Sequence, residues 1–329
     1  MLALIIALAV ALVLRTKAPP EVARLLPESD AIIYANLKPL RLATHFERTL
    51  VTHSSEYQHF IDATGIVAER DLDEMAFALH RMDDPNGPNG LVAYSEVFEG
   101  RFDGNRLARY LASIATAREI YAGHDIYTIP VGEAGAGRGR LLRVAQLGYD
   151  TVAASNMPTA EQIHSILDRY RASASPFAGS SLLSARYGDV PLLSSAWGIG
   201  HIGLPFSERG HISVLGLELP IPEDTTFVAS LQYRGVVRLR IDEIEPNEAD
   251  AEKSVESLNM LLGIFKSIEH VKPGAAQDQA IADVVNSLKI QQRGERTVLT
   301  ADIPLNLLRQ MATPISQDST FSGASRSTH

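Results

Sequence analysis

The chain opens on an unbroken apolar run, whereas the rest alternates short apolar stretches with amphipathic ones. Residues 1–14 read MLALIIALAVALVL and are followed by Arg15, Lys17 and two prolines. A soluble surface helix is not apolar on every side, so this run is typical of a segment in lipid, a secretory signal or a deeply buried core helix. We interpret residues 1–17 as an uncleaved signal anchor that places the lipid bilayer among the partners, and residues 18–25 as a linker.

The length of the apolar run leaves two alternatives open. Fourteen helical residues reach about 21 Å, whereas the hydrocarbon core of a bilayer is about 30 Å thick. Either Arg15 and Lys17 snorkel while the bilayer thins, or the anchor begins upstream of Met1, which we favour because no basic residue precedes the run. The positive-inside rule, taken literally, keeps the body cytoplasmic, whereas the likeness to a signal peptide favours an extracytoplasmic body.

Strand and helix patterns alternate after the linker. A β-rich run over residues 31–37 predicts a strand, and the spacing of apolar residues predicts a helix over 39–63 that packs Leu42 inward and stops at Gly65. Asp103 is expected to cap a later helix. Further strands are predicted over residues 74–80, 91–102, 126–131, 140–147, 151–154, 226–233, 236–241, 287–292 and 296–302, and further helices after Asn156, Pro246 and Pro304.

The order of these elements predicts the fold class. Twice in each half of the body, antiparallel strands are followed by an amphipathic helix. We therefore predict a duplicated α+β architecture behind the N-terminal membrane helix, with one half over residues 26–175 and the other over 176–312. Residues 172–184 are rich in Ser, Ala and Gly and suit a linker, and residues 313–329 lack apolar periodicity and suit a disordered tail.

Composition narrows the classes of function. The 329 residues contain no cysteine, which excludes a disulfide scaffold, a thiolate metal site and a cysteine nucleophile. Without Arg15 and Lys17, the 30 basic residues fall to 28 against 39 acidic ones, so the net charge goes from -9 to -11. An acidic body with no basic, aromatic-rich patch argues against nucleic acid as a partner.

One group of side chains suggests metal chemistry. His53, Glu56 and His59 recur at a spacing of three within the predicted helix, so they share a broad helix face. Two imidazoles and a carboxylate are competent metal ligands, although the spacing differs from H-E-x-x-H. An exposed polar helix face is the alternative.

Other motifs favour structural duties. The glycine-rich residues 132–139 run into a strand pattern rather than a helix, which favours a hairpin loop over a nucleotide-binding loop. Asp71 and Asp73 form a D-x-D of low specificity. No G-x-S-x-G or S-x-x-K motif is present, and no serine has an evident base nearby. We therefore expect no catalytic residue and no cofactor.

Several short motifs resemble an uncharacterised class of bacterial membrane-anchored proteins, a domain of unknown function. They are Leu26-Pro27-Glu28-Ser29-Asp30-Ala31, Thr64-Gly65 with Arg70-Asp71-Leu72-Asp73, and Gly100-Arg101-Phe102-Asp103. The resemblance covers most of residues 26–312, and it implies an envelope location and a repeated strand-helix body. The expected function is a single-pass, non-enzymatic binding or structural protein of the cell envelope, with an envelope protein as a further partner. The alternative is a metal-dependent enzyme that uses the cluster at residues 53–59.

Overall fold

The computed structural model describes ten stretches of the chain: residues 18–48, 53–84, 86–131, 139–172, 179–201, 211–214, 217–220, 225–233, 236–269 and 283–304. The strands are β1 (Ala31–Asn36), β2 (Leu72–Arg81), β3 (Val92–Gly100), β4 (Ala117–Tyr121), β5 (His124–Val131), β6 (Arg140–Gln146), β7 (Thr151–Ser155), β8 (Ala196–His201), β9 (His211–Val214), β10 (Leu217–Pro220), β11 (Thr226–Tyr233), β12 (Val237–Ile244), β13 (Lys289–Gln292) and β14 (Arg296–Ile303). The helices are α2 (Glu21–Arg24), α3 (Leu37–Thr44), η1 (Phe46–Arg48), α4 (Ser55–Thr64), α5 (Ala68–Asp71), α6 (Gly104–Ile114), α7 (Glu161–Arg171), α8 (Ser181–Arg186), η2 (Tyr187–Asp189) and α10 (Glu248–Glu269).

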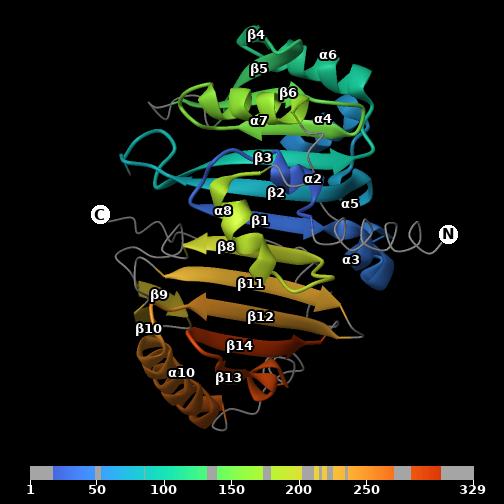
Figure 1. The fold of residues 1–329 in the computed structure, drawn as a ribbon. Coiled ribbons are helices and arrows are strands. Elements are labelled where there is room, and N and C mark those ends of the chain that lie inside the picture. Colours follow the sequence, from blue (N-terminus) through green and yellow to red (C-terminus); the bar gives the residue numbers. More distant parts are fainter. Residues whose placement is uncertain are drawn as a thin grey trace, which may run out of the picture.

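Twelve strands form one antiparallel sheet that runs through the whole body (Figure 1). Its order is β13-β14-β12-β11-β8-β1-β2-β3-β7-β6-β5-β4, and β9 pairs with β10 in a separate two-stranded sheet. The central pair is β1 with β8, in which Ala35 lies opposite Ala196. The predicted α+β class is confirmed, and the strands of both predicted halves belong to one sheet.

We call one end of this sheet the α3 end, because α3 leaves β1 there. Strands β1, β3, β6, β11 and β14 finish at this end, and β2, β7, β8 and β12 begin there. The opposite end carries the turn between β2 and β3.

The main core lies on one face of the sheet, beneath α2, α7 and α8 (Figure 1). Side chains alternate between faces along a strand, so Ile32 and Tyr34 of β1 point into this core with Ala76 and Ala78 of β2. The helices supply the matching apolar stripes, which are fully or almost fully buried: Val22, Leu25, Leu26, Ile163, Ile166, Leu167 and Leu183.

A second, smaller core lies on the other face, over β5, β6 and β7. Helix α6 places Leu107 and Leu111 against Tyr127 and Val144 of these strands. Asp103 caps α6 as predicted, because its side chain accepts a hydrogen bond from the backbone N–H of Arg106. The apolar stripes of α7 and α6 are therefore buried on opposite faces of the sheet.

The predicted continuous helix over residues 39–63 is wrong. Helix α3 ends at His45, which adopts the left-handed conformation with φ 53°, and α4 begins afresh after Ser54, whose hydroxyl accepts from the N–H of Tyr57. Leu42 does not point inward and is 77% exposed. The predicted stop at Gly65 is confirmed, since this residue ends α4 with φ 77°.

Three further differences arise from tertiary contacts. Residues 179–184, predicted as linker, include the start of α8, which buries Leu183 in the main core. Asn156 does not open α7, because its side chain accepts a hydrogen bond from the N–H of Tyr94 and the helix begins at Glu161. Strand β4 was not predicted because most of its residues are exposed and show no alternation.

Several predicted segments lie outside the described residues. They are the apolar run over residues 1–14, the glycine-rich loop at 132–138, the helix after Pro304 and the tail over 313–329. Within the ranges that the structure describes, no helix is both long enough and apolar enough to cross a membrane.

A substitution in the main core tests this packing. Leu167→Ala should lower the free energy of unfolding by about 2–5 kcal/mol, because it removes a fully buried side chain and leaves a cavity. Leu42→Ala removes the same atoms from an exposed site and should change stability by less than about 0.5 kcal/mol. Urea denaturation of the full-length protein measures both, and equal losses would contradict the assignment of Leu42 to the surface.

Candidate functional site

The three predicted metal ligands do not converge. The Nε2 atom of His53 lies 3.2 Å from Oε1 of Glu69, and its ring packs edge-on against Tyr57. Glu56 is exposed, and the ring of His59 lies beside Tyr110 of α6. Across the described residues, no three His, Asp or Glu side chains are arranged to hold a metal ion. The predicted helix face does not form, because His53 precedes α4, whereas Glu56 and His59 lie on α4 and are exposed.

The D-x-D motif serves the fold. Asp71 accepts hydrogen bonds from the backbone N–H of Val67 and the guanidinium of Arg70. Despite its burial, these hydrogen bonds and the charge of Arg70 hold the pKa of the carboxyl below its usual range. Asp73 pairs with Arg41 of α3, whose Nη1 lies 2.9 Å from the carboxylate oxygen. Asp73 therefore holds α3 against β2, whereas Asp71 closes the single turn of α5.

A buried polar chain was not recognised in the sequence. Nε2 of His80 lies 2.9 Å from the hydroxyl of Ser95, which lies 3.1 Å from the hydroxyl of Ser155. Burial lowers the pKa of His80, which favours the neutral ring. All three side chains are buried, so a substrate has no access to the serine hydroxyls. This arrangement of serine and histidine joins β2, β3 and β7 and is structural.

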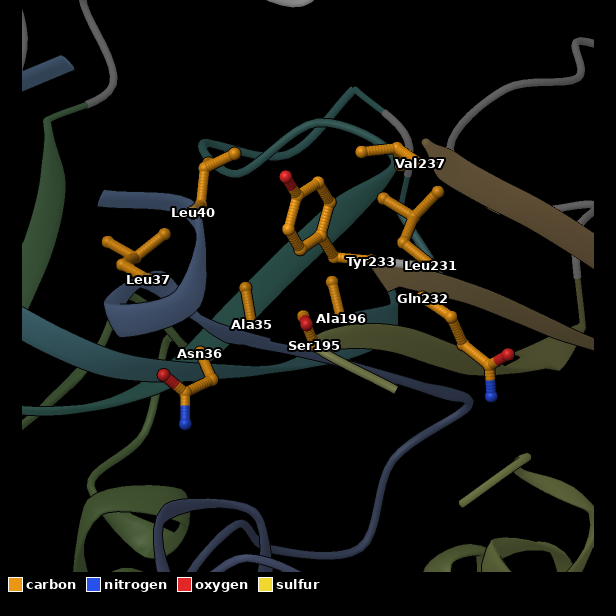
Figure 2. Close-up of a pocket in the computed structure, with 10 residues that line it drawn as sticks. All are labelled: Ala35, Asn36, Leu37, Leu40, Ser195, Ala196, Leu231, Gln232, Tyr233 and Val237. Carbon is orange, nitrogen blue, oxygen red and sulfur yellow. The ribbon is translucent and has the colours of Figure 1, made fainter. Parts of the chain in front are cut away.

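An apolar recess lies at the α3 end of the central strands (Figure 2). Its floor contains Ala35 of β1 and Ala196 of β8, which are direct partners across the central strand pair. Two alanines side by side leave space that larger side chains would fill. The surrounding walls come from α3, β11 and β12 and consist of Leu37, Leu40, Leu231, Tyr233 and Val237.

The recess offers contact area but few polar groups. Its volume is about 120 Å³, and the side chains of Asn36 and Gln232 point away from it in Figure 2. Asn36 donates instead to Glu74, and Gln232 donates to the backbone carbonyl of Leu192. Among the described residues that line the recess, the phenol of Tyr233 is the only ionisable group. Such a cavity suits an apolar group about the size of one ring or a short alkyl segment.

The recess is not evident in the sequence because its residues come from distant segments. The walls combine residues 35–40 with residues 231–237, and the two are brought together only by β1 and β8. The short apolar runs were recognised as strands, but alternation alone does not show which residues lie opposite each other. One sequence signal for the recess was present: the small residues Ala196, Gly198 and Gly200 occupy every second position of β8 and therefore lie on one face of the strand.

A carboxyl group lies on the same face of the sheet as the recess, on β3. Glu96 pairs across the strands with Phe77 and Ala154, and its side chain is only partly exposed. Burial raises the pKa of Glu96 to about 7. On β12, burial together with the neighbouring Glu245 likewise raises the pKa of Glu243 to about 7.

Comparisons with known proteins give no family. No family model matches the chain, and no curated protein matches it in sequence. Crystal forms I, III and IV of a protein named TP0453 are similar in structure, with identities of 10%, 9% and 11% and TM-scores of 0.43, 0.42 and 0.46. They cover 91%, 89% and 91% of this chain and 100%, 98% and 99% of theirs. TM-scores below 0.5 carry no argument about the site or its function.

The raised pKa of Glu96 predicts a pH-dependent stability. The folded state binds a proton that the unfolded chain releases near the ordinary pKa of 4.5, so this contribution is complete below pH 4.5 and is lost as the pH rises through about 7. Glu96→Gln should remove that loss, so the variant should gain stability over the wild type between pH 5 and 8. Chemical denaturation across this range measures it. The exposed Glu56→Gln is the control, and parallel pH profiles for wild type and Glu96→Gln would refute the assignment.

Proposed function

We propose that the protein is a membrane-anchored, non-enzymatic binding protein of the bacterial cell envelope that receives an apolar group in the recess at the α3 end. The observation that carries this proposal is the recess itself, a cavity of about 120 Å³ with a floor from β1 and β8 and apolar walls from β11, β12 and α3. Ligand sites are mostly apolar cavities on a preformed scaffold. The anchor is supported by the apolar residues 1–14, and the envelope location by the resemblance of residues 26–312 to membrane-anchored proteins.

The alternative of a metal-dependent enzyme has less support. Nε2 of His53 lies beside the carboxylate of Glu69. Glu56 and His59 are exposed, and the ring of His59 lies beside Tyr110. A metal enzyme needs three or more ligands around one point with an open position for substrate. The described residues offer no such point, whereas the recess offers a formed cavity. A binding role is therefore the function that the geometry supports best.

We also infer that the body arose by duplication of one unit. Outward from the central pair, the order β1, β2, β3, β7 on one side corresponds to β8, β11, β12, β14 on the other. Helix α6 intervenes between β3 and β7 along the chain, and α10 intervenes between β12 and β14. The antiparallel pairing of β1 with β8 relates the two series by an approximate two-fold rotation. Helices α3, α4 and α5 between β1 and β2 have no counterpart among the described residues of the second half.

Duplication predicts a residual likeness between the halves. A sequence profile built from homologues of residues 31–155 should match residues 196–303, with β1 aligned to β8 and β3 to β12. The shared positions should be the alternating core residues, because packing preserves them longest. A match in a different strand order would contradict duplication.

Filling the recess tests the binding role. Ala196→Leu places three more carbon atoms on the recess floor and should abolish photolabelling of the recess by a short alkyl diazirine, since the cavity holds only about one small group. The measurement uses full-length protein in nanodiscs, with labelled peptides identified by mass spectrometry. In the wild type, the label should lie on residues 37–40 and 231–237.

The matched control is Ala112→Leu, which makes the same change on the exposed face of α6 and should leave labelling intact. Denaturation of both variants separates filling of the recess from unfolding. Wild-type labelling that spreads evenly over the protein, or labelling of the recess that survives Ala196→Leu, would refute the binding role.

A further inference from the structure

The most exposed large apolar side chains gather at one end of the sheet. Among the described residues, the three highest exposures are those of Tyr149 at 94%, Leu193 at 88% and Leu42 at 77%, and all three lie at the α3 end. Leu192, Tyr233 and Val236 lie there as well and are also exposed. Exposed apolar side chains scattered singly need no explanation, but six at one end of a sheet form a surface that favours an apolar environment.

The register places these residues on separate strand connections. Tyr149 lies between β6 and β7, next to Asp150, whose carbonyl accepts a hydrogen bond from Gly100 at the end of β3. Leu192 and Leu193 precede β8, where Asn36 donates to the carbonyl of Ser195. Tyr233 and Val236 flank the turn between β11 and β12. Leu42 belongs to α3, so the surface is built from four connections that meet at one end (Figure 1).

Among the described residues, the opposite end of the sheet has no comparable group of strongly exposed apolar side chains. Its exposed apolar residues include Leu91 at 46%, Val131 at 40% and Leu141 at 38%, each of which is more than half covered. Two other apolar side chains are strongly exposed: Ile120 lies near the α3 end but on the edge strand β4, and Met260 lies on α10. The asymmetry between the two ends therefore does not reflect a general exposure of strand connections.

The exposed Leu193 at the α3 end has an unfavourable backbone conformation. Leu193 has φ 65°, in the left-handed region that a branched side chain seldom adopts. The backbone is held there by Gln232, whose amide donates to the carbonyl of Leu192, and by Ser194, whose hydroxyl donates to the carbonyl of Pro191. The connection thus leaves Leu192 and Leu193 exposed despite their hydrophobicity, and it holds Leu193 in an unfavourable backbone conformation. Strain of this kind is typical of a functional contact.

The chain enters the body at the same end. Helix α2 begins at Glu21 and packs against β2 and β3. Burial raises the pKa of Glu99 near the end of β3, and the charge of Glu21 lies close enough to add to this rise. Only residues 15–20 separate the apolar run 1–14 from Glu21, so the two are at most about 25 Å apart even in a fully extended chain. If the apolar run is embedded in a bilayer, the α3 end is the part of the body held against that bilayer.

We propose that the α3 end is a membrane-docking surface, in which Leu42, Tyr149, Leu192, Leu193, Tyr233 and Val236 enter the interface of the bilayer that holds the anchor. Interfacial elements bury apolar side chains about 5–10 Å into the boundary between headgroups and acyl chains, and tyrosine prefers this depth. The docked body stands with its strands running away from the membrane. The recess, whose wall includes Tyr233, then opens beside the lipid, which makes an acyl chain its nearest apolar ligand. This inference rests on the membrane anchor of the proposed function.

Site-directed spin labelling tests the docking surface directly. Because the chain contains no cysteine, Leu193→Cys and Tyr149→Cys each introduce a unique thiol for a nitroxide into the full-length protein. Both sites are exposed, so neither substitution removes a core contact. In vesicles of phosphatidylcholine with a minor fraction of phosphatidylglycerol, accessibility to a water-soluble nickel complex should fall about threefold at both sites relative to detergent-free, lipid-free protein, while accessibility to oxygen rises.

The matched control is Leu91→Cys, an exposed leucine at the opposite end, whose accessibility should not change when lipid is added. Flotation of the same vesicles reports the anchor separately. Flotation with residues 149 and 193 as accessible to nickel as residue 91 would overturn docking and leave the anchor standing. Failure to float would overturn both. Protection at only one of the two sites would also contradict a surface that spans several strand connections.

Discussion

The architecture depends on the antiparallel pairing of β1 with β8. This pair joins seven strands on one side to five on the other, and it is the only contact through which the described strands of the two halves share one sheet. Gly200 permits the pairing, because a side chain at this position would collide with Ala31 and with the carbonyl of Asp30. The same register sets Ala35 opposite Ala196 and so creates the floor of the recess. A larger residue at position 200 would disturb the strand pairing, whereas a larger residue at position 35 or 196 would fill the recess.

Local structure was predictable where a periodic pattern met a clear end signal. Strand β11 was predicted with its observed limits, and Asp103 and Gly65 mark the start of α6 and the end of α4 as expected. Prediction failed where a long-range contact decided the conformation. Asn156 resembles a helix cap in sequence, but the N–H of Tyr94 on a neighbouring strand takes its side chain. His45 gives no sequence signal for the left-handed conformation that ends α3.

The candidate site was less predictable than the fold. The residues with side chains suited to metal binding are not the residues that form the cavity. His53, Glu56 and His59 have the side chains of a metal site, and their spacing on a helix invites that hypothesis. In the structure these three side chains do not converge on one point. The recess is lined mainly by alanine, leucine, valine and tyrosine, and these residue types do not by themselves indicate a binding site in a sequence. A site defined by the absence of side-chain volume becomes visible only when strand partners are known.

The position of β1 near the start of the chain has a consequence for biosynthesis. Its partner β2 follows within about forty residues, but β8 is made about 160 residues after β1, so during synthesis the first seven strands present an unpaired edge. That edge lies at the centre of the final sheet and is apolar, with Ile32 and Tyr34 facing the future core. Contacts between such distant residues form slowly, and an open edge of this kind readily pairs with other chains. Until β8 emerges, this central edge therefore stays open to pairing with other chains.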